Sequence, residues 1–192
     1  MSGAADPLAL DVRTRLPDAL RVLVEEHPRD DWDADPGFNA LIRFWLDRHM
    51  MFRRIVERLG AETEAALDGG DPARFGQALS RLGSTLVGEL QMHHRIEDVH
   101  YFPVLAGKDA RVSRGFEILD RDHHLLDARL EGFVTGANGV LGRLRDSDDP
   151  RTDVAGFRPA LTDLSRLLDR HLEDEEELVV PVILKHGTAG LE

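Results

Sequence analysis

Side chains of the kind that bind metal ions recur at matched spacings in this sequence. Glutamate follows histidine by four residues at two places, His93 with Glu97 and His171 with Glu175, and proline follows each histidine by ten. Imidazole and carboxylate ligands without thiolate suit iron, manganese or zinc. The chain has no cysteine, which excludes zinc ribbons, iron–sulfur clusters and cysteine nucleophiles. The repeated spacing therefore predicts a cation site built from nitrogen and oxygen ligands.

Four long segments of helical periodicity must position these residues. Apolar residues recur at steps of three and four, and β-branched residues do not gather in alternating runs, so helices are expected and strands are not. Turn-type residues separate the segments at 68–72, 106–109 and 146–150. Each helix would run for about 25 to 30 residues, and short connections favour up-down-up-down neighbours. We predict an all-α antiparallel four-helix bundle over residues 37–184, an N-terminal appendage over 1–36 and a C-terminal tail over 185–192.

In each segment, polar residues take places that continue the apolar stripe. The four histidines lie at seven-residue spacing from apolar stripe positions, and each glutamate follows its histidine by one turn. The six inward residues are His49, His93, Glu97, His123, His171 and Glu175. Their neighbours His94 and His124 lie about 100° around the helix and are expected to point away. His100, seven residues after His93, is expected to face inward as a hydrogen-bonded core histidine.

The six inward residues are expected to meet at one height of the bundle. Counted from the turn centres, the four imidazoles lie within about one helical turn of each other. Burying two carboxylates without partners costs on the order of several kcal/mol each. Either a hydrogen-bonded polar network or bound cations could meet this cost. The number of converging groups favours cations.

The two half-motifs, HHRIEDVHYFP from His93 and HLEDEEELVVP from His171, suggest a duplicated helical hairpin. With His49 and His123 each ahead of one half, the chain resembles the hemerythrin-like, or HHE cation-binding, family over about residues 37–184. The resemblance implies a non-haem di-iron centre that cycles between Fe²⁺ and Fe³⁺. It implies that the four histidines are terminal ligands and that Glu97 and Glu175 bridge the irons beside an oxo, hydroxo or water. Zinc or manganese remains open, because spacing does not name the metal.

The sequence departs from the oxygen-carrying members of this family at two places. Asp127 stands where they have a further histidine, and Glu176 stands where they have an aspartate five residues after the last histidine. Asp127 is expected either to bind a metal or, by slight preference, to accept a hydrogen bond from a ligand histidine. Tyr101 is four residues after Glu97, where its phenol could lie near the metals or serve only for packing.

Three functions follow as expectations from the resemblance and these departures. The first is a protein that binds or reacts with dioxygen or a related small oxidant. The second is an enzyme that processes peroxide or nitric oxide, because fewer nitrogen ligands leave open positions. The third is an iron-responsive or iron-holding module, in which metal loading exposes or hides a partner surface.

Composition narrows the partners and the location. The chain has 192 residues and a formal net charge of −12, which disfavours nucleic acid as a partner. Its longest apolar run, 178–184, is much shorter than the ~20 residues of a membrane-spanning helix, and its first residues lack a signal-peptide pattern. A cytoplasmic protein without a membrane partner is expected. In the appendage, residues 17–26 are expected to form a short helix and 29–37 a loop, together capping the bundle.

Overall fold

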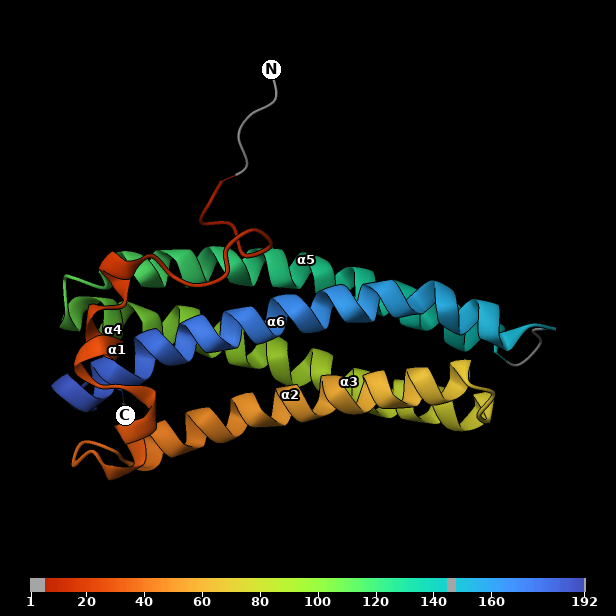
Figure 1. Ribbon diagram of the computed structural model, residues 1–192, viewed down its shortest axis with the longest axis horizontal. Helices are drawn as coiled ribbons and strands as arrows, with labels where there is room; N and C mark the ends of the chain where they lie inside the picture. The colour runs from red at the N-terminus through yellow and green to blue at the C-terminus, as the bar shows by residue number, and fades with distance from the viewer. Residues whose placement is uncertain (1–5, 145–147, 192) are drawn as a thin grey trace, which may run out of the picture. The chain divides into compact units, whose positions relative to one another are not determined.

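The computed structural model describes residues 6–144 and 148–191, and the regular elements of these residues are all helical. The long helices are α2 (Ala40–Leu67), α3 (Pro72–Ile96), α5 (Ser113–Arg143) and α6 (Pro150–His186) (Figure 1). The short elements are η1 (Asp18–Leu20), α1 (Val22–Glu26), η2 (Arg29–Ala34), η3 (Glu97–Tyr101) and α4 (Phe102–Lys108). The predicted all-α helical bundle is confirmed. None of the helices among these residues is long and apolar enough to cross a membrane.

The helices are shared between two compact units. Unit 1 comprises residues 6–49, 93–125 and 169–191, and unit 2 comprises Met50–Met92 and Leu126–Leu168. Each unit therefore contains one stretch of each long helix. All six predicted ligands belong to unit 1. The site can therefore be described within one unit.

The core of unit 1 joins the N-terminal segment to the long helices. Leu16, Leu23 and Trp32 are buried in the same cluster as Trp45 of α2 and Phe116 of α5. The region expected to be a loop contains the 3-10 helix η2. It forms because the Asp31 amide donates to the Pro28 carbonyl at 3.0 Å, while Trp32 is 4% exposed. The expected helix over 17–26 is split into η1 and α1, with Pro17 at the N-cap of η1.

A π-helical turn interrupts the second long segment, which the sequence predicted as one continuous helix. The Phe102 amide donates to the Glu97 carbonyl five residues back. Pro103 has no amide hydrogen and cannot make the usual bond to residue 99, which fits the break in the regular pattern. The extra residue in this turn shifts the faces that follow. His100 is therefore exposed rather than inward, and the half-buried Tyr101 packs against Trp45 with ring centroids 4.8 Å apart.

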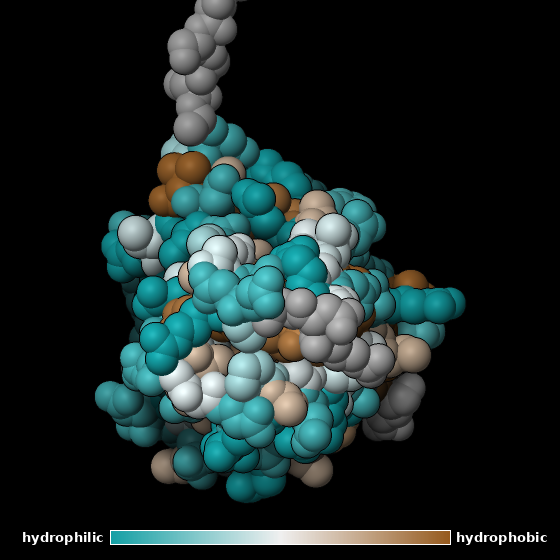
Figure 2. Space-filling view, turned by 90° about the vertical axis from the view of Figure 1, so that its right-hand side faces the viewer, coloured by the Kyte–Doolittle hydropathy of each residue, from teal (hydrophilic) through white to brown (hydrophobic). Residues whose placement is uncertain are grey.

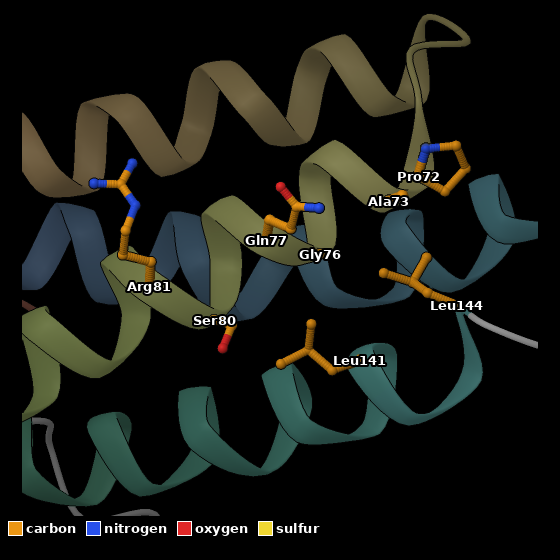
Figure 3. A pocket seen from close by; sticks show the side chains of 8 residues that line it. All are labelled: Pro72, Ala73, Gly76, Gln77, Ser80, Arg81, Leu141 and Leu144. Atoms are coloured by element: carbon orange, nitrogen blue, oxygen red, sulfur yellow. The ribbon is translucent and has the colours of Figure 1, made fainter.

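In unit 2, α2 and α3 are joined through Gly69, whose φ of +96° is unfavourable for other residues. Ring packing in this unit includes Phe133 and Phe157, with centroids 5.5 Å apart. A hollow between α3 and α5 has Leu141 and Leu144 facing α3 (Figure 3). Among the described residues, its lining includes no histidine, aspartate or glutamate. The molecular face drawn in Figure 2 is mostly hydrophilic, with apolar side chains scattered across it.

Candidate metal centre

Four helical stretches of unit 1 bring the six predicted residues together. His49 comes from α2, His93 from α3, His123 from α5 and His171 from α6. Glu97 begins the π turn and Glu175 lies one turn after His171. Five of the six residues are at most 1% exposed, and the side chain of His93 is 11% exposed. The layer that the sequence predicted is present in the interior of the unit.

The imidazoles are arranged as two pairs. The Nε2 atoms of His49 and His93 are 3.1 Å apart, and those of His123 and His171 are also 3.1 Å apart. Two ligand atoms about 2.1 Å from one ion and at right angles lie roughly 3 Å apart. Each pair therefore has the spacing of neighbouring ligands on one cation.

Each glutamate faces both pairs. Glu97 places Oε1 3.0 Å from His93 Nε2 and Oε2 3.5 Å from His123 Nε2. Glu175 places Oε1 3.5 Å from His49 Nε2 and Oε2 3.4 Å from His171 Nε2. The two oxygens of one carboxylate thus point to different imidazole pairs. This is the arrangement that a carboxylate needs to bridge two cations.

Carboxylates behind the imidazoles fix the nitrogen that each presents. His49 Nδ1 lies 3.0 Å from Glu176 Oε1, and His123 Nδ1 lies 2.7 Å from Asp98 Oδ1. His171 Nδ1 lies 3.5 Å from Asp122 Oδ2. Because an ionised carboxylate only accepts hydrogen bonds, Nδ1 must carry the hydrogen in these contacts. The Nε2 lone pair of each ring is then directed toward its paired ring.

These tautomers make the site suitable for cations. With Nδ1 protonated, His171 has an Nε2 hydrogen to share across its 3.1 Å separation from His123 Nε2 only when its ring carries a positive charge. Both oxygens of Glu97 and Oε2 of Glu175 are buried without a hydrogen-bond donor within the described parts of the chain. Buried lone pairs and carboxylate oxygens without donors are stabilised by a positive ion. The residues present therefore fit a metal.

Without metal, the charges of the site shift several pKa values in opposite directions. Burial and the neighbouring Glu175 raise the pKa of Glu97 well above its usual value. Burial opposes ionisation of Glu175 too, but His49 and His171 outweigh it and hold its pKa well below normal. Burial alone would lower the pKa of His171, whereas Asp122 and Glu175 raise it to about 9. Protons thus occupy part of the site when cations do not.

His94 is a seventh residue of the site, contrary to the expectation that it points away. It is 3% exposed, and its ring stacks on His123 with centroids 4.0 Å apart and an interplanar angle of 11°. His94, His123 and His171 together could hold one ion, and His49, His93, Glu97 and Glu175 another. His94 is rotated about 100° around α3 from His93 but is still buried. The two consecutive histidines in the sequence could have indicated that both belong to the site. His124 is exposed, as expected.

Aromatic side chains close the site. Trp45 donates its Nε1 hydrogen to Glu175 Oε1 at 2.5 Å and packs its ring against His93 at 6.1 Å. Phe102 stacks on His123, with ring centroids 5.3 Å apart. These contacts orient one bridging carboxylate and keep apolar surface around the polar cluster.

The remaining predicted residues have different outcomes. Glu176 is 1% exposed and contacts His49 Nδ1, which places it behind a ligand histidine. Tyr101 contacts Trp45, and its proximity to a metal stays a prediction. Asp127 belongs to unit 2, so its predicted role also stays a prediction.

Several polar residues of the site could not be predicted from the periodicity of the apolar stripes. Asp98 and Asp122 are each adjacent in sequence to an inward residue, so a helical wheel places them on the flank of the stripe. Arg13 contacts Asp122 and Asp174, and Arg29 contacts Glu176, from a distant part of the chain. No spacing rule links them, because their partners are more than 100 residues away.

Comparison with known proteins places the bundle in one family. The family model described as "Hemerythrin HHE cation binding domain" matches residues 40–184. This range includes all six predicted ligands and His94. No curated protein and no solved structure matches the chain.

Proposed function

Because the chain belongs to the family of hemerythrin HHE cation-binding domains, we propose that it holds two iron ions and binds or reacts with dioxygen or a related small oxidant. The observation that carries the proposal is the double bridge. Glu97 and Glu175 each direct one oxygen to the His49–His93 pair and the other to the His123–His171 pair. One cation alone would leave half of this arrangement unused.

The ligands divide into two sets around the shared carboxylates. His49 and His93 would hold one iron, and His123 and His171 would hold the other with His94 beside them. Nitrogen and carboxylate ligands without sulfur fit iron among the redox-active metals. Bound iron would supply reversible electron transfer and open coordination positions for a small molecule. The protein contributes the fixed ligands, the fixed tautomers and a surrounding layer of aromatic side chains.

The exposure of the ligands suggests where a small molecule would enter. His93 is the most exposed of the six predicted ligands, while His49, His171 and Glu175 are fully buried. Because the ligands are this deeply buried, the centre favours a molecule with few atoms. This supports dioxygen, peroxide or nitric oxide over an organic substrate.

Metal analysis of the purified protein with its absorption spectrum tests this proposal. We expect about two irons per chain and a near-ultraviolet charge-transfer band that changes when the ferrous protein meets air. The variants Glu97→Ala and Glu175→Ala should each lose the band and at least one iron. Glu117→Ala, at an exposed position of α5, is the matched control and should keep both. Zinc as the bound metal, or a spectrum that does not respond to air, would overturn the proposal.

A further inference from the structure

A buried arginine connects the N-terminal segment to the metal centre. Arg13 is 8% exposed and lies at the end of a turn in which its amide donates to the Ala9 carbonyl at 2.9 Å. Its guanidinium donates Nε–H to Asp174 at 2.8 Å and its terminal nitrogens to both oxygens of Asp122. A further donation reaches the Leu8 carbonyl at 2.9 Å. A buried charge held this fully is fixed in position.

The carboxylate that Arg13 holds is the one behind a ligand histidine. Asp122 is 2% exposed and directs Oδ2 to His171 Nδ1 at 3.5 Å. The bidentate contact with the arginine determines how the carboxylate plane is turned. It therefore also determines which oxygen His171 meets. A chain of contacts thus runs from Arg13 through Asp122 to the His123–His171 pair.

A second arginine of the same segment, whose side chain is 44% exposed, makes a single contact behind the other imidazole pair. Arg29 Nη1 lies 2.7 Å from Glu176 Oε2, and Glu176 Oε1 lies 3.0 Å from His49 Nδ1. The Arg29 guanidinium lies over the ring of the buried Trp32, 4.8 Å from its centroid, which keeps it in place. Both imidazole pairs are therefore supported from the N-terminal segment.

We propose that Arg13 and Arg29 are positioning residues for the metal centre. They hold Asp122 and Glu176, which in turn fix the orientation and Nδ1–H tautomer of His171 and His49. The proposal rests on the cation binding proposed above. The N-terminal segment lies outside the matched residues 40–184. In this proposal it helps to orient the ligand histidines.

The full set of contacts at position 13 needs the three nitrogens of an arginine side chain. Three of its nitrogens meet two carboxylates and a carbonyl at once, and lysine has only one nitrogen to offer. Removing the guanidinium removes the bidentate contact that fixes the plane of the Asp122 carboxylate. His171 then loses a fixed acceptor. Loss of such partners behind a ligand typically weakens metal affinity about 10–100-fold.

A third arginine of the segment provides the matched control. Arg21 forms an ion pair with Glu177 of α6, and both side chains are mostly buried. Within the described residues, this ion pair includes neither a ligand histidine nor a carboxylate behind one. Arg21→Met therefore removes an ion pair between the N-terminal segment and α6 but leaves the carboxylates behind the imidazoles in contact with Arg13 and Arg29.

The test is titration of the metal-free full-length chain with Co²⁺, whose visible absorption reports the geometry of its ligands. Wild type, Arg13→Met, Arg13→Lys, Arg29→Met and Arg21→Met are compared, with the melting temperature of each metal-free protein measured alongside. We expect Arg13→Met and Arg29→Met to bind about 10–100-fold more weakly than Arg21→Met, with altered Co²⁺ bands. Arg13→Lys should fall between Arg13→Met and wild type.

The outcomes separate this inference from the proposed function. Equal Co²⁺ affinity and identical bands in Arg13→Met, Arg29→Met and Arg21→Met, with wild-type binding intact, would overturn the inference alone. Failure of wild type to bind Co²⁺ would overturn both. If Arg13→Met does not melt cooperatively, Arg29→Met and Arg13→Lys decide the matter by the same comparison.

Discussion

At the scale of single residues, the candidate site buries carboxylates and imidazoles whose charges are costly to remove from water. Bound cations would compensate the carboxylate charges. The raised pKa of Glu97 and the lowered pKa of Glu175 show how unequal the two carboxylates become without metal. Burial disfavours both negative charges, and only Glu175 is compensated by neighbouring imidazoles. In the proposed dinuclear centre, metal binding would remove this inequality, because each carboxylate would then face two positive ions.

Replacing Glu97 with glutamine should separate stability from metal binding. Because burial and the neighbouring Glu175 raise the pKa of Glu97, this carboxyl group destabilises the metal-free fold at pH values above its usual pKa. We therefore expect Glu97→Gln to leave the metal-free melting temperature unchanged or higher, while metal content falls to one ion or none. Thermal melting and metal analysis check this, with Glu117→Gln as the exposed control. A variant that melts well below wild type yet keeps two ions would contradict it.

The dependence of metal stabilisation on pH follows from His171. Its folded pKa of about 9 exceeds the ordinary 6.5, so its protonation stabilises the metal-free fold fully below about 6.5 and loses this effect as pH rises through 9. A bound cation requires the neutral ring. The rise in melting temperature on adding Zn²⁺ should therefore grow between about pH 6.5 and pH 9. A rise that shrinks over this range would show that His171 does not bind the ion.

His94 offers a direct test of the second ligand set. Removing its imidazole takes one of three nitrogens from the group formed with His123 and His171. We expect His94→Ala to retain one tightly bound ion and to weaken the other about 10-fold or more. His124→Ala, at an exposed position of α5, is the control and should bind as wild type does. Two ions held equally tightly in both variants would exclude His94 as a ligand.

At the scale of elements, the same local motif leads to different helices. Pro103 follows His93 by ten residues and Pro181 follows His171 by ten. The first proline lies just after the π turn η3, whereas α6 runs through the second without a break. The sequence repeat therefore predicted the inward placement of the histidine and glutamate in both halves but could not indicate which half would carry the extra residue. The consequence is visible at His100, which was predicted to face inward and is exposed.

The close approach of α5 and α6 depends on one glycine. A Cβ added at Gly115 would lie 2.6 Å from Leu178 Cδ1, and Leu178 is 1% exposed. We expect Gly115→Ala to destabilise the protein by about 1–3 kcal/mol through overpacking. At Gly132 of the same helix nothing lies within 4 Å of the added Cβ, so Gly132→Ala should stabilise by about 0.5–1 kcal/mol. Chemical denaturation measures both, and equal effects would contradict the packing described.

At the scale of the whole molecule, the candidate site belongs to unit 1 alone. Stripe counting predicted the fold class and the six central residues because helical periodicity is a local property of the sequence. It could not predict Arg13 behind Asp122 or Arg29 behind Glu176, since those contacts join residues 109 and 147 positions apart. It also predicted wrongly that His94 points away from the site. A helical wheel gives the direction of a side chain but does not show whether neighbouring helices cover it.

Metal binding should slow amide hydrogen exchange more in unit 1 than in unit 2. Binding at about 100 times the dissociation constant stabilises the native state by about 2.7 kcal/mol, which corresponds to a melting-temperature rise of roughly 5–10 °C in a chain of this size. Since the ligands belong to unit 1, we expect the slowing of amide hydrogen exchange to be largest in the stretches 40–49, 93–108, 113–125 and 169–186. Hydrogen-exchange mass spectrometry with and without metal measures this. Greater protection in Met50–Met92 than in unit 1 would contradict the assignment.

The most direct measurement is a crystal structure of the iron-loaded protein with anomalous scattering recorded at the iron edge. Two iron peaks are expected, one beside the Nε2 atoms of His49 and His93 and the other beside those of His123 and His171. Glu97 and Glu175 should each contact both peaks. A single peak, or two peaks without a shared glutamate, would contradict the dinuclear centre.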